Sequence, residues 1–183
     1  ASEGDVAGAL AQWDELIRIN PQSHRAHQQW GTLRALTAAS RSELDAAEER
    51  LERAHAINPE ETGALLVLGE IALLRGDSER AEQRLGAACR TNPRAVGGFF
   101  LRGYLVWKRG DETRARELLS EARQALGKEW QPKGSTSEGD VNRKQHVEGT
   151  PFSRFWERWD GAADPVGAFA SLEAFLRGEG RFK

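Results

Sequence analysis

The sequence contains no methionine, only one cysteine and only one tyrosine. The single cysteine, Cys89, excludes an internal disulfide framework and any metal site built from several thiolates. No run of about 18 apolar residues occurs, which argues against a transmembrane helix. The opening residues ASEGDVAGAL lack a basic segment followed by an apolar core, so no signal peptide is recognisable there. The sequence assigns no cellular compartment and fits either a soluble cytoplasmic protein or the soluble part of an exported or anchored one.

Excess charge of one sign is also missing, since 26 Lys and Arg face 28 Asp and Glu for a net charge of −2. A nucleic-acid-binding surface needs a concentration of basic residues, which this balance does not indicate. No phosphate-binding loop, zinc signature or nucleophile elbow occurs either. The sequence therefore predicts no enzyme, no cofactor and no bound metal within these 183 residues.

A pair of histidines and the single cysteine are candidate sites in this sequence. His24 and His27 are three positions apart and would share one side of a helix, but no third metal ligand accompanies them. We interpret them as surface histidines. Cys89 falls on the inner side of a predicted helix, where a buried, inert thiol is expected.

What the sequence does contain is a repeat with a period of about 34 residues. Alanines at positions 9, 47, 81 and 115 are separated by 38, 34 and 34 residues. Three further sets keep the same phase. They are a large apolar residue (Trp13, Leu51, Leu85, Leu119), a proline (Pro21, Pro59, Pro93) and a glycine (Gly31, Gly69, Gly103).

Between these landmarks the apolar residues recur at intervals of three and four, which is typical of helices with one buried face. The string RGD at Arg75–Asp77 and again at Arg109–Asp111 interrupts the pattern. There a glycine can end one helix and the aspartate can cap the next. Each unit is therefore expected to be two helices joined by a tight turn. Small residues are expected at their crossing, with Gly69 against Ala81 and Gly103 against Ala115.

This spacing resembles the tetratricopeptide repeat (TPR) family, whose 34-residue signature carries a Leu-Gly pair, then Ala, an apolar residue and Pro. The unit that matches best offers Leu65, Leu68, Gly69, Ala72, Ala81, Leu85, Ala88 and Pro93. The resemblance covers roughly the first 130 residues. It implies an all-α, right-handed α-solenoid of helix-turn-helix repeats, whose first helices line a concave groove that binds a protein or peptide.

The register divides the chain into six segments. They are the second helix of a truncated first repeat (1–23), a repeat with a four-residue turn insertion (24–61), two regular repeats (62–95 and 96–129), a long connection (130–148) and a degenerate C-terminal helix pair (149–183). Gly4-Asp5 is expected at a turn, followed by a helix over Asp5–Ile19. Its apolar face around Trp13, Leu16 and Ile17 is expected to stay partly uncovered and to offer a surface for self-association. The insertion near Thr37–Leu44 is expected to lengthen a turn and to tolerate deletion.

The resemblance also assigns a partner-binding groove. Its predicted residues are Gln28, Gln29, Thr32, Leu36, Leu66, Val67, Glu70, Leu73, Phe100, Leu101, Tyr104, Trp107 and Lys108, with Leu101 expected to belong to the core. Some family members hold a peptide's terminal carboxylate with Asn and Lys on this face. Apolar residues stand at the central positions here, so the resemblance does not extend to that clamp. An exposed apolar patch of this size usually meets a partner.

The C-terminal segment is rich in aromatic residues, including Phe152, Phe155, Trp156, Trp159 and Phe169. We expect it to stack on the helix over residues 113–126 and end the solenoid. The alternative is that this segment, or the connection over 130–148, crosses into the groove and occupies part of the partner site. In either arrangement its deletion is expected to expose apolar surface and cause aggregation.

The function predicted from the sequence is that of a scaffold that binds a protein or peptide, without nucleic-acid binding or membrane insertion in this segment. The alternative is a substrate-recruiting or regulatory domain of a larger enzyme or assembly factor, whose catalytic part lies outside this chain.

Overall fold

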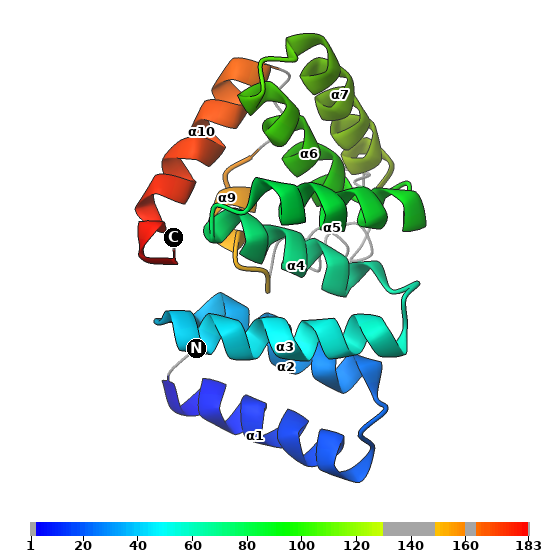
Figure 1. The fold of residues 1–183 in the computed structure, drawn as a ribbon, viewed down its shortest axis with the longest axis vertical. Helices are drawn as coiled ribbons and strands as arrows, with labels where there is room; N and C mark the ends of the chain where they lie inside the picture. Colours follow the sequence, from blue (N-terminus) through cyan, green and yellow to red (C-terminus); the bar gives the residue numbers. More distant parts are fainter. Residues whose placement is uncertain (1–2, 130–148, 160–163, 183) are drawn as a thin grey trace, which may run out of the picture.

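A computed structural model describes residues 3–129, 149–159 and 164–182 of the chain, and all regular structure within these ranges is helical (Figure 1). The helices are α1 (Glu3–Ile19), α2 (His24–Thr37), α3 (Arg41–Ile57), α4 (Thr62–Leu74), α5 (Ser78–Thr91), α6 (Val96–Lys108), α7 (Glu112–Glu129), α9 (Ser153–Trp156), α10 (Pro165–Gly178) and the 3₁₀ turn η1 (Gly180–Phe182). The prediction of an all-α protein is confirmed.

The helices form antiparallel pairs that stack along the long axis of the molecule (Figure 1). Helices α2 and α3, α4 and α5, and α6 and α7 pack within pairs, whereas α3 packs on α4 and α5 on α6 between them. Helix α1 packs on α2 at one end of the stack. Each pair buries an apolar face that it cannot bury alone, so stacking creates one continuous core.

The two turns at the RGD strings have the glycine and the aspartate cap that the sequence predicts. Gly76 and Gly110 adopt positive φ angles of 74° and 90°, a conformation that glycine takes without a steric penalty. The Asp77 carboxylate then accepts a hydrogen bond from the Arg80 amide and caps α5. Asp111 does the same for the amide of Arg114 at the start of α7. The sequence prediction of these two turns is confirmed.

The expected partners of the small residues at the helix crossings are confirmed in part. A Cβ atom added to Gly103 would lie 3.4 Å from the main-chain oxygen of Ala115, as expected, with the Phe169 ring of α10 closer at 2.9 Å. One added to Gly69 would instead meet a methyl group of Leu85 at 2.5 Å. At Gly31 both kinds of neighbour occur, with Leu51 at 2.7 Å and the main-chain oxygen of Ala47 at 2.9 Å.

Three expectations about the N-terminal half are wrong. His27 is not a surface histidine, since it is 5% exposed and its Nε2 lies 2.9 Å from the main-chain oxygen of Pro21. Gly4 and Asp5 lie within α1 rather than in a turn. The insertion after α2 does not lengthen a turn either, since Ala38–Ser40 separates α2 from α3 just as Arg75–Asp77 separates α4 from α5. The additional residues extend the helices instead. The Ser40 hydroxyl accepts a hydrogen bond from the Glu43 amide, which lets α3 begin early.

Because residues 41–44 form the first turn of α3 and both Ala38 and Leu44 pack in the core, we expect a four-residue deletion within positions 37–44 to destabilise the protein. Leu44 is fully buried and Ala38 is 5% exposed, so any such deletion shifts apolar side chains out of register. The free energy of unfolding, measured by urea denaturation, is expected to fall by about 2 kcal/mol or more, the scale of losing a buried leucine. A deletion that leaves the urea midpoint unchanged would show that this stretch is only a spacer.

Candidate partner-binding surface

The first helices of the repeats, α2, α4 and α6, lie side by side and form one face of the stack. The repeat register places equivalent positions in rows across this face. One row contains Thr32, Glu70 and Tyr104, and the neighbouring row contains Gln28, Leu66 and Phe100. This is the face on which the sequence predicted the groove.

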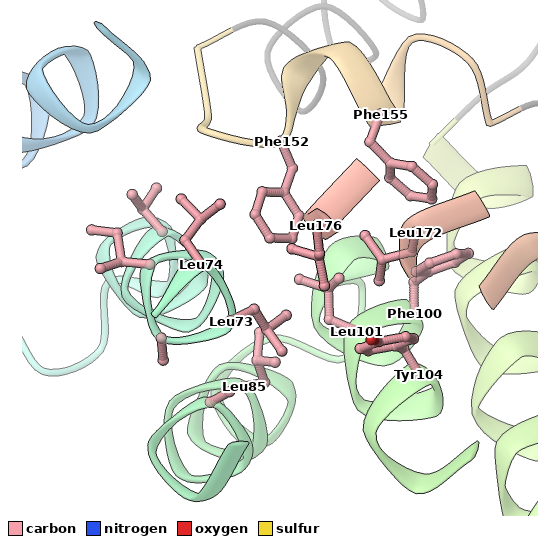
Figure 2. Close-up of a cluster of buried hydrophobic side chains, with 14 of the residues drawn as sticks. Leu73, Leu74, Leu85, Phe100, Leu101, Tyr104, Phe152, Phe155, Leu172 and Leu176 are labelled. Atoms are coloured by element: carbon pink, nitrogen blue, oxygen red, sulfur yellow. The ribbon is translucent and has the colours of Figure 1, made fainter. Parts of the chain in front are cut away.

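The C-terminal segment packs against the α4 and α6 part of this face. The ring of Phe100, which is fully buried, lies 5.4 Å from Phe155, 5.3 Å from Trp156, 4.8 Å from Trp159 and 5.3 Å from Phe169, measured between centroids. Figure 2 shows Phe155 of α9 and Leu172 of α10 near Phe100, while Phe152, which precedes α9, lies beside Leu176 of α10. Most of these ring pairs are edge-to-face, the arrangement that aromatic quadrupoles favour. The aromatic part of the groove is therefore core.

A single carboxylate fixes the segment to α4. Glu70 is 3% exposed. Its Oε2 accepts a hydrogen bond of 3.1 Å from the main-chain amide of Phe152, and its Oε1 accepts one of 2.9 Å from Trp156 Nε1. Burial raises the pKa of Glu70 to about 7, although both hydrogen bonds stabilise the charged form and act in the opposite direction. Such a carboxylate needs its two donors, because a buried polar group without partners is costly.

Helix α10 is held at the other end of the groove. The ring of Trp107 lies 6.2 Å from Tyr104 and 5.7 Å from Phe169. Lys108 Nζ donates a hydrogen bond of 2.8 Å to Glu173. This contact raises the pKa of Lys108 and lowers that of Glu173. The lysine is exposed, so the ion pair contributes little energy and mainly fixes the position of α10.

The predicted groove residues therefore divide into two groups. On α4 and α6, Lys108 is the exposed member of the predicted set. The others are buried or half-buried against the C-terminal segment or within the helix stack; they are Leu66, Val67, Glu70, Leu73, Phe100, Leu101, Tyr104 and Trp107. Those on α2 keep contact with solvent: Gln28 and Thr32 are half-buried, Gln29 is exposed and Leu36 is 41% exposed.

The expectation that the C-terminal segment only stacks on the last repeat helix is wrong. Helix α10 contacts α7, but it contacts α6 as well, and α9 reaches across to Glu70 on α4. The physical reason is that an aromatic stripe on α6 and aromatic residues of the segment can bury each other. The connection over 130–148 lies outside the described residues.

Sequence reasoning missed the role of Glu70. The signal was present, because Glu70 is the one charged residue in the apolar stretch ALLVLGEIALL. A lone carboxylate among apolar residues is seldom buried without a partner. Its partners lie more than 80 positions away, and no local pattern identifies them.

We expect Trp107 and Phe169 to be energetically coupled. Trp107→Ala should lower the free energy of unfolding by about 2 kcal/mol, somewhat less than for a fully buried tryptophan. In a double-mutant cycle with Phe169→Ala, urea denaturation should give a coupling energy of roughly 0.5–1.5 kcal/mol, as for other aromatic pairs. Trp13→Ala, on the distant helix α1, should be additive with Phe169→Ala. Additivity of the Trp107 pair would contradict the docked arrangement of α10.

Other kinds of site receive no support within the described residues. No three His, Cys, Asp or Glu side chains there are arranged to hold a metal ion. In the same ranges, no helix is both long enough and apolar enough to cross a membrane. Burial raises the pKa of the Cys89 thiol, which disfavours the reactive thiolate.

The fold and this face define a class: a helical-repeat protein built from stacked antiparallel helix pairs. Two family models, both described as tetratricopeptide repeat, match residues 38–95 and 75–129. The chain belongs to the tetratricopeptide repeat family. A comparison with curated proteins gave no match. Tetratricopeptide repeats generally mediate protein–protein interactions and are typically scaffolds without catalytic activity of their own.

Proposed function

We propose that the protein is an interaction scaffold that binds a protein or peptide partner through its concave face. The α2 part of that face, with Gln28, Gln29, Thr32 and Leu36, offers the accessible contact surface.

One observation carries this proposal: the face formed by α4 and α6 already packs against a segment of its own chain. Glu70 accepts a hydrogen bond from a main-chain amide of that segment, a contact that any peptide can make. Phe100 packs against the aromatic side chains of the segment. Main-chain hydrogen bonds combined with pockets for side chains are a common way to recognise peptides.

The accessible part of the face has suitable chemistry for a partner. Leu36 is one of four exposed large apolar side chains within the described ranges. Gln29 and Thr32 lie on the same side of α2, at spacings of three and four, and supply hydrogen-bonding groups next to it. An apolar anchor with a polar surround is the usual composition of a binding surface.

The proposal is tested by affinity capture with the full chain as bait and quantitative mass spectrometry. Gln29→Arg combined with Leu36→Glu should reduce the recovered partner at least tenfold, because both changes lie in the proposed contact. Gln83→Arg combined with Arg90→Glu alters two exposed positions of α5 in a comparable way and should leave recovery unchanged. Equal recovery with both double variants would refute a partner site on α2.

A further inference from the structure

Apolar surface is left uncovered at both ends of the molecule. Within the described residues the exposed large apolar side chains are Leu16, Ile19, Leu36 and Val166. Leu36 lies on α2 and belongs to the proposed partner site. The other three lie on α1 and α10, which are far apart along the long axis (Figure 1).

A cleft opens between α9 and α10. Its volume is about 500 Å³, within the range of roughly 300–1,000 Å³ typical of pockets that bind ligands. Phe155, Trp159 and Phe175 contribute its aromatic walls. Gly167, Ser171 and Ala174 of α10 line it with small side chains, so another chain can approach the helix closely. The cleft suits the large side chains of a second helix, as Gly69 suits Leu85 within a repeat.

The charged side chains that line the cleft are both basic. The exposed carboxylates near the lining residues in sequence, Glu157 and Asp164, do not line it. Asp164 caps α10 by accepting hydrogen bonds from the amides of Val166 and Gly167. Arg154 and Arg158 line it, are exposed and are four positions apart. Neither has an ion-pair partner among the residues that the structure describes. Along α10 the exposed residues are uncharged apart from Arg177, which pairs with Glu173. Helix α7, by contrast, exposes mostly Arg and Glu. The cleft therefore favours an apolar protein segment with carboxylate side chains beside its apolar residues.

Helix α1 has the complementary chemistry. Leu16 is 46% exposed and Ile19 is 65% exposed, and they are three positions apart on one side of the helix. Glu15 precedes Ile19 by one turn on the same side. The helix carries four carboxylates and one guanidinium in all. Glu15 pairs with Arg18, but both side chains are more than half exposed, so this pair can exchange partners at little cost.

We propose that α1 of one copy of this chain docks into the cleft between α9 and α10 of a second copy. Leu16 and Ile19 enter the cleft, and the carboxylates of α1 face Arg154 and Arg158. The two faces differ and lie at distant parts of the molecule, so the contact is head-to-tail and can repeat along an open chain of copies. This inference uses surfaces other than the α2 face and does not depend on the proposed function.

Sedimentation velocity of two complementary double variants tests the contact. One carries Leu16→Glu and Ile19→Glu, and the other carries Arg154→Glu and Arg158→Glu; all four side chains are exposed, so both variants should fold. The wild-type protein should show an average mass that rises with concentration and falls with added salt. Each variant alone should remain at the monomer mass of 20.3 kDa. An equimolar mixture should form pairs of twice that mass and nothing larger, because each pair retains one intact contact.

The matched control is Arg90→Glu with Arg94→Glu, which reverses two exposed arginines at the same spacing elsewhere and should assemble as the wild type does. A wild-type protein that stays monomeric at every concentration overturns the proposal. So does assembly by the Arg154→Glu, Arg158→Glu variant alone, which would indicate a symmetric contact between two α1 helices. Failure of the two variants to pair when mixed overturns it as well.

Discussion

Phe100→Ala is expected to cost about 3–5 kcal/mol of unfolding free energy, the usual loss for a fully buried phenylalanine. Its ring is the centre of the contact between α6 and the C-terminal segment, with four aromatic partners within 5.4 Å. Removing it leaves a cavity that several aromatic rings line, and large rings collapse poorly into such a space. Urea denaturation followed by circular dichroism measures the effect.

Phe99→Ala is the matched control for this measurement. Phe99 precedes Phe100 on α6 but is only half-buried at the margin of the same core. Its truncation should cost clearly less. A loss for Phe100→Ala no greater than that for Phe99→Ala would mean that the C-terminal segment does not pack against α6 in solution.

The stability of the wild-type protein is expected to fall by about 2–3 kcal/mol between pH 5 and pH 8 through Glu70 alone. The pKa of Glu70 is raised to about 7 in the folded protein, above the ordinary value of 4.5. A raised folded pKa means that the folded state holds the proton more tightly than the unfolded state. The resulting stabilisation is complete below the unfolded pKa and is lost as the pH rises through 7.

Glu70→Gln isolates this contribution, because glutamine stays neutral across the whole range. The free energy of unfolding from urea denaturation at pH 5, 6, 7 and 8 should fall less steeply for this variant than for the wild type, by the 2–3 kcal/mol given above. Glu121→Gln, at an exposed position of α7, should retain the wild-type slope. Parallel slopes for wild type and Glu70→Gln would indicate a folded pKa close to the ordinary one.

The repeats were predictable because the determinants of each repeat lie within one period. Ala81 and Leu85 share a helical face, and Gly76 and Asp77 mark a turn by backbone and capping chemistry that any sequence reader can recognise. The insertion after α2 was misjudged, because a count of extra residues does not say whether they coil or extend a helix. The decisive signals were the Ser40 cap and the apolar Leu44, which continue the helical pattern toward the N-terminus of α3.

Whether the candidate site is open or covered by another part of the chain could not be predicted from the repeat pattern. The register correctly grouped Phe100, Tyr104 and Trp107 on one helix face, and an exposed aromatic face is a sound reason to expect a partner. That partner is in part the C-terminal segment of the same chain. Whether aromatic surfaces separated by a long connection meet depends on their three-dimensional complementarity, which neither periodicity nor composition contains.

The bond between Glu70 and Trp156 joins residues 86 positions apart, and that between Lys108 and Glu173 joins residues 65 apart. Stacked repeats otherwise contact only their neighbours, so they can unfold one unit at a time. These two contacts, from α4 to α9 and from α6 to α10, couple the unfolding of the repeats to that of the C-terminal segment. They are also long-range, and long-range contacts slow folding because a large loop must close before they form. The C-terminal half of this solenoid should therefore melt in one cooperative step, while α1 frays independently.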